Sequence, residues 1–309
     1  MTTFRYLITA EDAGDQIQHF LRFKQGISRK VVISLKHLPE GILLNGSHAR
    51  TIDLLREGDT LEINLPDQAR KLPPCEIDVP RLYWDRDVAV FNKPAGMPVH
   101  QSGGHIFGTL ASVYATLCEK EGNSGTFRAV NRIDKDTSGL LVVAKDDATH
   151  IGLSQQMAVH SVERAYNTIV YGGFAQDEGF VESNLGRSKT DRKKMAVYPA
   201  SEPHTKYAYT GYKVLERLGE FTMLECRLKT GRTHQIRVHM ASIHHPVAGD
   251  PVYGPHNCIT SLHGQCLHAK TLGFIHPITG EHLRFDSELP DYFTRFLTTL
   301  RQRTGGNNE

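Results

Sequence analysis

The sequence has few cysteines and no long apolar run. Its five cysteines are never closer than eight residues, which argues against both a CxxC zinc site and a disulfide framework, so we expect buried, reduced thiols. No run of roughly 18 or more apolar residues occurs, and the first residues lack the charged-then-apolar profile of a secretion signal. We therefore expect a cytoplasmic protein with no membrane contact.

The motifs that bind common cofactors are also missing. There is no Walker-type Gly-Lys-Ser/Thr, no Gly-x-Gly-x-x-Gly after a strand and no Gly-x-Ser-x-Gly, which disfavours nucleotide hydrolysis, dinucleotide redox chemistry and the common serine hydrolases. Seventeen histidines are present without a His-Glu-x-x-His, and His234 and His239 are five residues apart rather than four. We expect no cofactor and no metal; a metal-dependent hydrolase is the third hypothesis.

Positive and negative charges nearly balance, with a net charge of +2 over 309 residues. This small excess does not by itself indicate an anionic partner. The basic residues are nevertheless concentrated. Stretches at 16–39, 187–194 and 226–249 are rich in lysine and arginine, and the first and third contain no acid. Such stretches are typical of contacts with phosphate groups, so their distribution favours a nucleic-acid partner.

The first 66 residues form a small predicted α/β domain. Apolar spacing predicts two short basic helices, one around 17–21 and one that Ser28 caps, followed by strands at 42–44 and 61–65 around the Asn45-Gly46 turn. A run of positive charge is by itself typical of a solvated helix face. The candidate RNA-binding residues in these helices are Arg22, Lys24, Arg29, Lys30 and Lys36.

A proline-containing linker at 67–80 separates this domain from a second one at 81–303, and the end, 304–309, is expected to be disordered. In the second domain strands and helices alternate irregularly, which favours an α+β fold with a mixed, largely antiparallel central sheet. The expected strands are 88–91, 139–144, 166–171, 206–214 and 221–228, and the expected helices lie near 109–121, 147–159, 233–242 and 292–300.

The segment 128–145 carries the strongest chemical signal. Asp134 and Asp136 lie in a polar turn directly before a short buried strand, where the core would hold the backbone while a carboxylate faces a cleft. A simple turn or a surface ion pair with Arg132 would give the same pattern. A calcium loop is excluded, because the twelfth position is Lys145 instead of Glu.

A second segment at 230–240 contains a glycine break, a candidate helix cap at Thr233 and a basic helix start. Arg237 lies four residues past Thr233, so its side chain can point back toward whatever occupies the helix start.

The ordered blocks 91–100, 131–145, 164–166, 231–239 and 245–250 resemble those of the RluA family of RNA pseudouridine synthases. The resemblance spans roughly 85–285 and implies the pseudouridine synthase fold. It also implies an isomerase that detaches uracil from its ribose, rotates it and reattaches it through carbon, without a cofactor. The carboxylate could attack the sugar, attack the base or remove a sugar proton.

Matched residue by residue, the resemblance implies that Asp134 is the catalytic carboxylate, that Tyr166 stacks on the target base and that Arg237 keeps Asp134 ionised. Arg132 would fill the space left by the flipped uridine. The substrate-binding set is completed by Arg232, Ile236, His234 and Lys93. Asn131 stands where the family usually has histidine, so we expect altered hydrogen bonding around the turn.

Residues 14–66 resemble the small RNA-binding domain found in a ribosomal small-subunit protein and in tyrosyl-tRNA synthetase, although Gly14-Asp15-Gln16 departs from its usual opening. The leading hypothesis is an RNA pseudouridine synthase, expected to be a monomer, that acts on large-subunit ribosomal RNA. Its alternatives are a transfer RNA pseudouridine synthase and a catalytically silent RNA-binding or ribosome-assembly factor.

Overall fold

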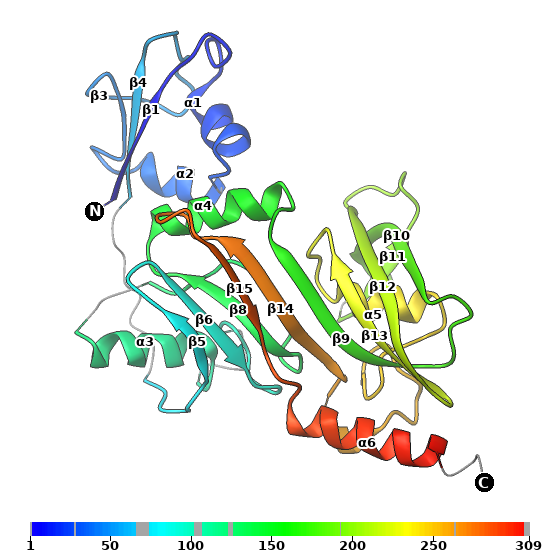
Figure 1. Ribbon diagram of the computed structural model, residues 1–309. Coiled ribbons are helices and arrows are strands. Elements are labelled where there is room, and N and C mark those ends of the chain that lie inside the picture. Colours follow the sequence, from blue (N-terminus) through cyan, green and yellow to red (C-terminus); the bar gives the residue numbers. More distant parts are fainter. Residues whose placement is uncertain are drawn as a thin grey trace.

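The computed structural model contains two separate β-sheets with helices around them (Figure 1). Strands between Thr2 and Leu65 form the smaller sheet, and strands from Arg81 onward form the larger one. The structure describes residues 2–27, 29–65, 74–101, 107–122, 126–191, 193–262 and 264–305. Within these ranges no helix combines the length and the apolar character needed to cross a bilayer.

The smaller sheet has the strand order β1-β4-β2-β3 and packs against short helices. The helices share a core with the sheet through Ile17, Leu21 and Leu35. Both expected basic helices are present, although the first continues into a π-helical turn and Ser28 lies outside the described residues. The elements are β1 (Thr2–Leu7), α1 (Ile17–His19), η1 (Phe20–Lys24), α2 (Arg29–Leu35), β2 (Ile42–Leu44), β3 (Ser47–His48) and β4 (Thr60–Leu65).

The larger sheet has eleven strands in the main order β11-β10-β12-β13-β9-β14-β8-β6-β5, with β15 beside β14 and β7 beside β8. In its described parts β8 and β14 are parallel and the other pairs are antiparallel, which confirms the mixed, largely antiparallel sheet. The strands are β5 (Arg81–Trp84), β6 (Val88–Lys93), β7 (Arg128–Ala129), β8 (Ser138–Ala144), β9 (Glu163–Tyr171), β10 (Glu178–Arg187), β11 (Met195–Tyr198), β12 (Lys206–Leu218), β13 (Phe221–Leu228), β14 (Leu267–Ile275) and β15 (His282–Asp286).

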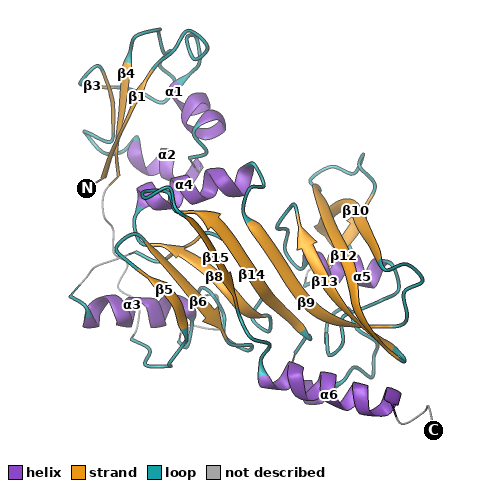
Figure 2. Cartoon of the chain, in the orientation of Figure 1, coloured by secondary structure: helices purple, strands orange, loops and turns teal. Residues whose placement is uncertain are grey.

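Helices pack on this sheet along its length (Figure 2). Both faces of β8 are buried, because Leu141 and Val143 join the core that includes residues of α3, while Leu140 and Val142 join the core under α4. The remaining helices, α5 and α6, pack on the half of the sheet that contains β12 and β13. The helices are α3 (Leu110–Lys120), α4 (Asp147–Ala158), α5 (Gln235–Ser242), the short 3-10 turn η2 (Thr260–Leu262) and α6 (Asp291–Gly305).

Helix α4 also joins the two sheets. It lies between the small domain and the large sheet (Figure 1), and its Ile151 packs against the core of the small domain. The side-chain amide of Gln155 donates a hydrogen bond of 3.4 Å to the carbonyl of Gln25. The small domain is therefore attached to the helix that backs the strand β8.

Several details differ from the sequence-based expectations. Helix α6 continues to Gly305, so residues 304 and 305 are helical instead of disordered, and 306–309 lie outside the described residues. Residues 66–73 of the linker region also lie outside them. The basic run 187–194 connects β10 to β11 through a turn closed by a hydrogen bond from Ser188 N to Lys194 O, with Arg192 undescribed.

Candidate active site

The turn before β8 presents Asp134 as the sequence suggests. Strands β7 and β8 pair antiparallel, and Asn131 supports the turn by accepting a hydrogen bond from Val142 N at 2.9 Å and donating one to Leu140 O at 3.3 Å. Gly139, at the start of β8, has φ +110, and a Cβ there would lie 2.3 Å from the carbonyl oxygen of Ala269 on β14. The close approach of the parallel strand β14 thus requires glycine at position 139. The Asp134 side chain in the adjoining turn is 25% exposed.

Arg237, the residue that contacts Asp134, is held in place by a buried ion pair with Asp250. Arg237 donates from Nη1 to Asp134 Oδ2 at 2.9 Å, and from Nε and Nη2 to the two oxygens of Asp250 at 2.7 and 2.9 Å. Asp250 is fully buried and also accepts hydrogen bonds from the backbone N–H groups of Val252 and Tyr253. Such a two-pronged pair fixes the guanidinium plane, so its remaining edge meets Asp134 from one direction.

The charges of this group support one another. Burial disfavours the carboxylate of Asp250, but the hydrogen bonds and charge of Arg237 outweigh it and hold the Asp250 pKa below its usual value. Burial likewise disfavours the Arg237 cation, but Asp250 and Asp134 raise the pKa of Arg237 above its usual value. The guanidinium therefore stays charged and faces Asp134 throughout the pH range in which proteins stay folded.

His234 lies near the same carboxylate oxygen as Arg237. Its Nε2 is 4.0 Å from Asp134 Oδ2, and its Nδ1 is 2.9 Å from the hydroxyl of Tyr253. That hydroxyl also accepts a hydrogen bond from Met195 N at 2.8 Å, and its own proton can be donated to Nδ1 in the tautomer that carries the imidazole proton on Nε2. Burial lowers the pKa of His234, although Asp134 opposes this. The Nε2 edge of the imidazole thus faces Asp134.

The start of α5 differs from the expected Thr233 cap. His234 precedes the helix in the left-handed conformation, at φ +55, and no side chain caps the first turn. Instead the Oε1 of Gln235 accepts hydrogen bonds from Arg232 N and the Thr230 hydroxyl, at 2.9 and 2.8 Å. The strained residue is the one whose ring is directed at Asp134, which is typical of a functional position.

These side chains surround a pocket of about 170 Å³. Its walls combine the Tyr166 ring of β9 and Ile236 with charged groups near the mouth, where Arg132 is exposed. The Nε of Arg232 donates to Tyr207 O at 2.9 Å. Of the eight predicted catalytic and substrate-binding residues, the structure brings seven to this pocket: Arg132, Asp134, Tyr166, Arg232, His234, Ile236 and Arg237. A pocket that combines an aromatic wall with convergent polar groups is suited to a flat, polar organic ring.

Lys93 is the exception, and its prediction as a substrate contact is corrected. It is fully buried, and its Nζ donates to the carbonyls of Pro94, Met97 and Lys135 at 2.8, 2.8 and 2.9 Å. All three donor positions are thus occupied. Burial lowers the pKa of Lys93 to about 7, while Asp136 and Asp134 oppose this change. Lys93 holds the turn that carries Asp134 against the 94–97 segment.

Replacing Lys93 with methionine is therefore expected to reduce the free energy of unfolding by about 3 kcal/mol or more, because three buried carbonyls each lose a partner. Urea unfolding of the variant and the wild type measures this. Lys213→Met, which changes a largely exposed lysine on β12, is the matched control and is expected to cost less than about 1 kcal/mol. Equal losses would contradict a special role for Lys93.

Sequence reasoning assigned no role to three residues of this site, although Arg164 and Asp250 lie in the blocks that resemble the family. Asp250 and Tyr253 follow α5 and meet Arg237 and His234 only through the fold, and no spacing rule connects them. Arg164 on β9 also lines the pocket. Its neighbour Tyr166, two residues along the strand, is the signal that could have indicated it, since alternate residues share one face.

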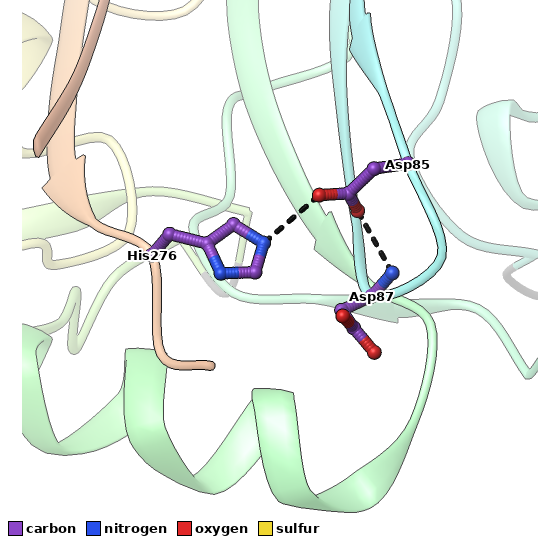
Figure 3. A group of neighbouring side chains, drawn as sticks. All are labelled: Asp85, Asp87 and His276. Atoms are coloured by element: carbon purple, nitrogen blue, oxygen red, sulfur yellow. Dashed lines mark hydrogen bonds and ion pairs between the residues drawn. The ribbon is translucent and has the colours of Figure 1, made fainter. Parts of the chain in front are cut away.

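A group of possible metal ligands lies elsewhere, where Asp85, Asp87 and His276 approach within 4.8 Å of one another (Figure 3). His276 Nδ1 accepts from the backbone N–H groups of Ile278 and Thr279, so Nε2 carries the proton that it donates to Asp85 at 3.0 Å. Asp85 accepts three further hydrogen bonds, from Tyr83 and two backbone N–H groups. These contacts use the ligand atoms of Asp85 and His276, so the cluster fastens a turn.

The basic residues of the small domain divide into two groups. Arg29 and Lys36 are exposed on or next to α2, and the guanidinium of Arg22 lies 4.8 Å from the centre of the Phe23 ring. Lys24 is instead occupied within the domain, by Asp12 at 2.7 Å, Asp15 at 3.0 Å and the carbonyl of Glu11. Lys24 is nevertheless exposed, so its role as an RNA contact stays a prediction. The side chain of Lys30 is outside the described part.

Comparison with known proteins gives consistent matches. A family model described as RNA pseudouridylate synthase matches residues 87–242. The chain is 42% identical over 265 residues to the Bacillus subtilis protein named "Uncharacterized RNA pseudouridine synthase YlyB", covering 84% of this chain and 86% of that protein. It is 45% identical over 242 residues to "Ribosomal large subunit pseudouridine synthase D" of Zymomonas mobilis, covering 75% of each.

Solved structures show the same fold. The structure titled "Human RNA Pseudouridylate Synthase Domain Containing 4" superimposes with a TM-score of 0.58 at 24% identity, covering 72% of this chain and 92% of that one.

Proposed function

Because the chain belongs to the RNA pseudouridylate synthase family, we propose that it isomerises specific uridines of large-subunit ribosomal RNA to pseudouridine, with Asp134 as the catalytic carboxylate. One observation carries this assignment: a partly exposed carboxylate lies at a pocket with an aromatic wall, and a buried Arg237–Asp250 pair holds it from behind. The family likeness supplies the reaction, and the geometry supports the role of each side chain.

The reaction breaks the bond from the ribose to N1 of uracil and forms a bond from the ribose to C5. C5 loses its proton and N1, which carries none in uridine, gains one, so the product is an isomer and no electrons are gained or lost overall. The Asp134 carboxylate can attack the sugar or the base, or remove a sugar proton. In each case the carboxylate acts as an anion, and Arg237 holds it by a charged hydrogen bond.

The pocket walls suit the detached base. Tyr166 is buried to all but 6% and presents an aromatic wall, while Ile236 is 4% exposed. Stacking between a base and an aromatic ring stabilises by about 1–3 kcal/mol, which is comparable with the cost of taking a base out of its stack. Arg132, exposed at the rim, can enter the space that the uridine leaves.

The ribosomal target has two supports. Several relatives, including the one from Zymomonas mobilis, are named as large-subunit ribosomal pseudouridine synthases. The small basic domain on α4 offers a second surface for RNA near the sheet that carries the pocket. A ribosomal substrate would place the protein in the cytoplasm, and we propose that one monomer suffices, because the pocket is formed by one chain.

Pseudouridine mapping of total RNA from wild-type and deletion cells tests the proposal. We expect one or a few sites in large-subunit ribosomal RNA to lose the modification and to regain it when the wild-type chain is supplied. Loss confined to transfer RNA would support the alternative target. Unchanged pseudouridine together with altered ribosomal particles would instead support a silent assembly factor.

The small domain is tested by its exposed charges. Arg29→Gln combined with Lys36→Gln is expected to weaken RNA binding and to reduce the slope of log affinity against log salt by about 1 for each phosphate that the protein no longer binds. Binding titrations at several salt concentrations measure this. Arg50→Gln is the matched control, since Arg50 is exposed in the same domain but paired with Asp53. A double variant with the wild-type slope would contradict the RNA role.

A further inference from the structure

Arg164 is a buried cation in the wall of the pocket. It lies on β9 two residues before Tyr166, so both side chains are on the same face of the strand. The residue is 6% exposed and lines the pocket beside Leu228 and Gly231. Burial lowers its pKa below the usual value of arginine. A charge in this position needs partners, because burying an unpaired ion is costly.

The partners that Arg164 has within the chain are weak. Its Nη2 reaches the carbonyls of Leu228 and Lys229 at 3.5 Å each, at the long limit of a hydrogen bond, and its buried Nε has no partner. In the part of the chain that the structure describes, no carboxylate pairs with Arg164. Arg237 in the same pocket shows the contrast, since each of its three nitrogens donates to a carboxylate at 2.7 to 2.9 Å.

Gly231 places no side chain against the guanidinium of Arg164. A Cβ on Gly231 would lie 2.8 Å from Nη1 of Arg164, and Gly231 itself is exposed. The backbone of Gly231 is outside the left-handed region, so its conformation would accept alanine. The glycine at position 231 therefore leaves space around Nη1 of Arg164; it is not required by the backbone conformation.

We propose that Arg164 and Gly231 form a site for one phosphodiester group of the RNA next to the target uridine, an inference that rests on the proposed function. The unpaired charge selects a phosphate over an uncharged carbonyl of the base, because only an anion compensates the buried cation. Two residues along a strand span about 7 Å, so a base stacked on Tyr166 would have a neighbouring phosphate within reach of Arg164.

The test uses the full-length protein and a synthetic RNA stem-loop that carries the uridine identified by mapping. The RNA is made with natural linkages and with a single neutral methylphosphonate linkage directly 5′ or 3′ of that uridine. Dissociation constants and kcat/KM are measured for the wild type, Arg164→Gln and Arg164→Lys. Arg227→Gln is the matched control, because Arg227 precedes Leu228 but is exposed and paired with Glu225.

We expect Arg164→Gln to lower kcat/KM on natural RNA by roughly 10- to 100-fold, the usual effect of losing a hydrogen bond between charged groups, with Arg164→Lys in between. One neutral linkage should lower the kcat/KM of the wild type and of the Arg227→Gln control by a factor similar to that of the Arg164→Gln change. The same linkage should lower the kcat/KM of Arg164→Gln by less than about twofold. The effects of the Arg164→Gln change and of the neutral linkage would then not add. An arginine with a purely structural role would give additive effects.

The proposal is overturned if each neutral linkage weakens Arg164→Gln as much as it weakens the wild type. Gly231→Ala gives a second test that keeps the arginine: its methyl group would cover Nη1, so this variant should also become insensitive to the neutral linkage while unfolding at the wild-type temperature. A wild type that forms no pseudouridine in any RNA refutes the proposed function instead, whereas an active wild type that tolerates both neutral linkages refutes only the phosphate site.

Discussion

Replacing Asp134 with asparagine is expected to lower kcat at least about 10⁴-fold while changing the affinity for RNA by less than about threefold. Asparagine has the shape of aspartate but neither attacks carbon nor accepts a proton as the carboxylate does. The Asp134 side chain is 25% exposed and Arg237 keeps its buried pair with Asp250, so the fold loses little when the charge of Asp134 is removed. Pseudouridine formation and RNA binding are measured on the same RNA.

Asp136→Asn is the matched control for this prediction. Asp136 lies in the same turn, two residues after Asp134, and does not line the pocket. We expect this variant to keep activity within about tenfold of the wild type. If Asp134→Asn kept more than about a tenth of the wild-type activity, or if both variants were equally inactive, Asp134 would not be the catalytic carboxylate.

Replacing Arg237 with methionine is expected to have the second largest effect, on stability and on catalysis together. It leaves Asp250, which is fully buried, without its cation, and breaking such a pair costs about 3–5 kcal/mol. It also removes the hydrogen bond to Asp134, so we expect kcat/KM to fall by roughly 100-fold or more. Urea unfolding and single-turnover kinetics measure the two effects separately.

A double variant separates the two effects. Arg237→Met with Asp250→Asn removes the buried charge while the amide oxygen can still accept the backbone N–H groups of Val252 and Tyr253. Stability should recover by at least half of the decrease, whereas catalysis should stay as low as in the single variant. Recovery of both would mean that Arg237 serves the fold alone, and RNA affinity that falls in step with kcat/KM would mean that it is a phosphate contact.

Local patterns in the chain were sufficient for most elements of the fold. The buried strand β8 and the helices α3, α4 and α5 were expected within a few residues, because they have clear apolar periods and breaks. Strands β10 and β14 were not expected. In β14 the buried positions include His268 and Thr271, so the strand lacks both alternation and a continuous apolar run, and only its neighbours β8 and β9 show why these polar residues are buried.

By itself, the sequence determined that Asp134 lies in a turn before a buried strand, that Arg237 is at the start of a helix, and that basic residues are concentrated in separate stretches. Those are properties of neighbouring residues. The fold alone decided that Asp250 orients Arg237 and that the buried Lys93 supports the turn of Asp134. It also decided that Arg164 is a buried cation that no carboxylate among the described residues pairs with. These depend on pairs of atoms far apart in the chain, whose distances follow from the sheet order and from what each side chain loses by leaving water.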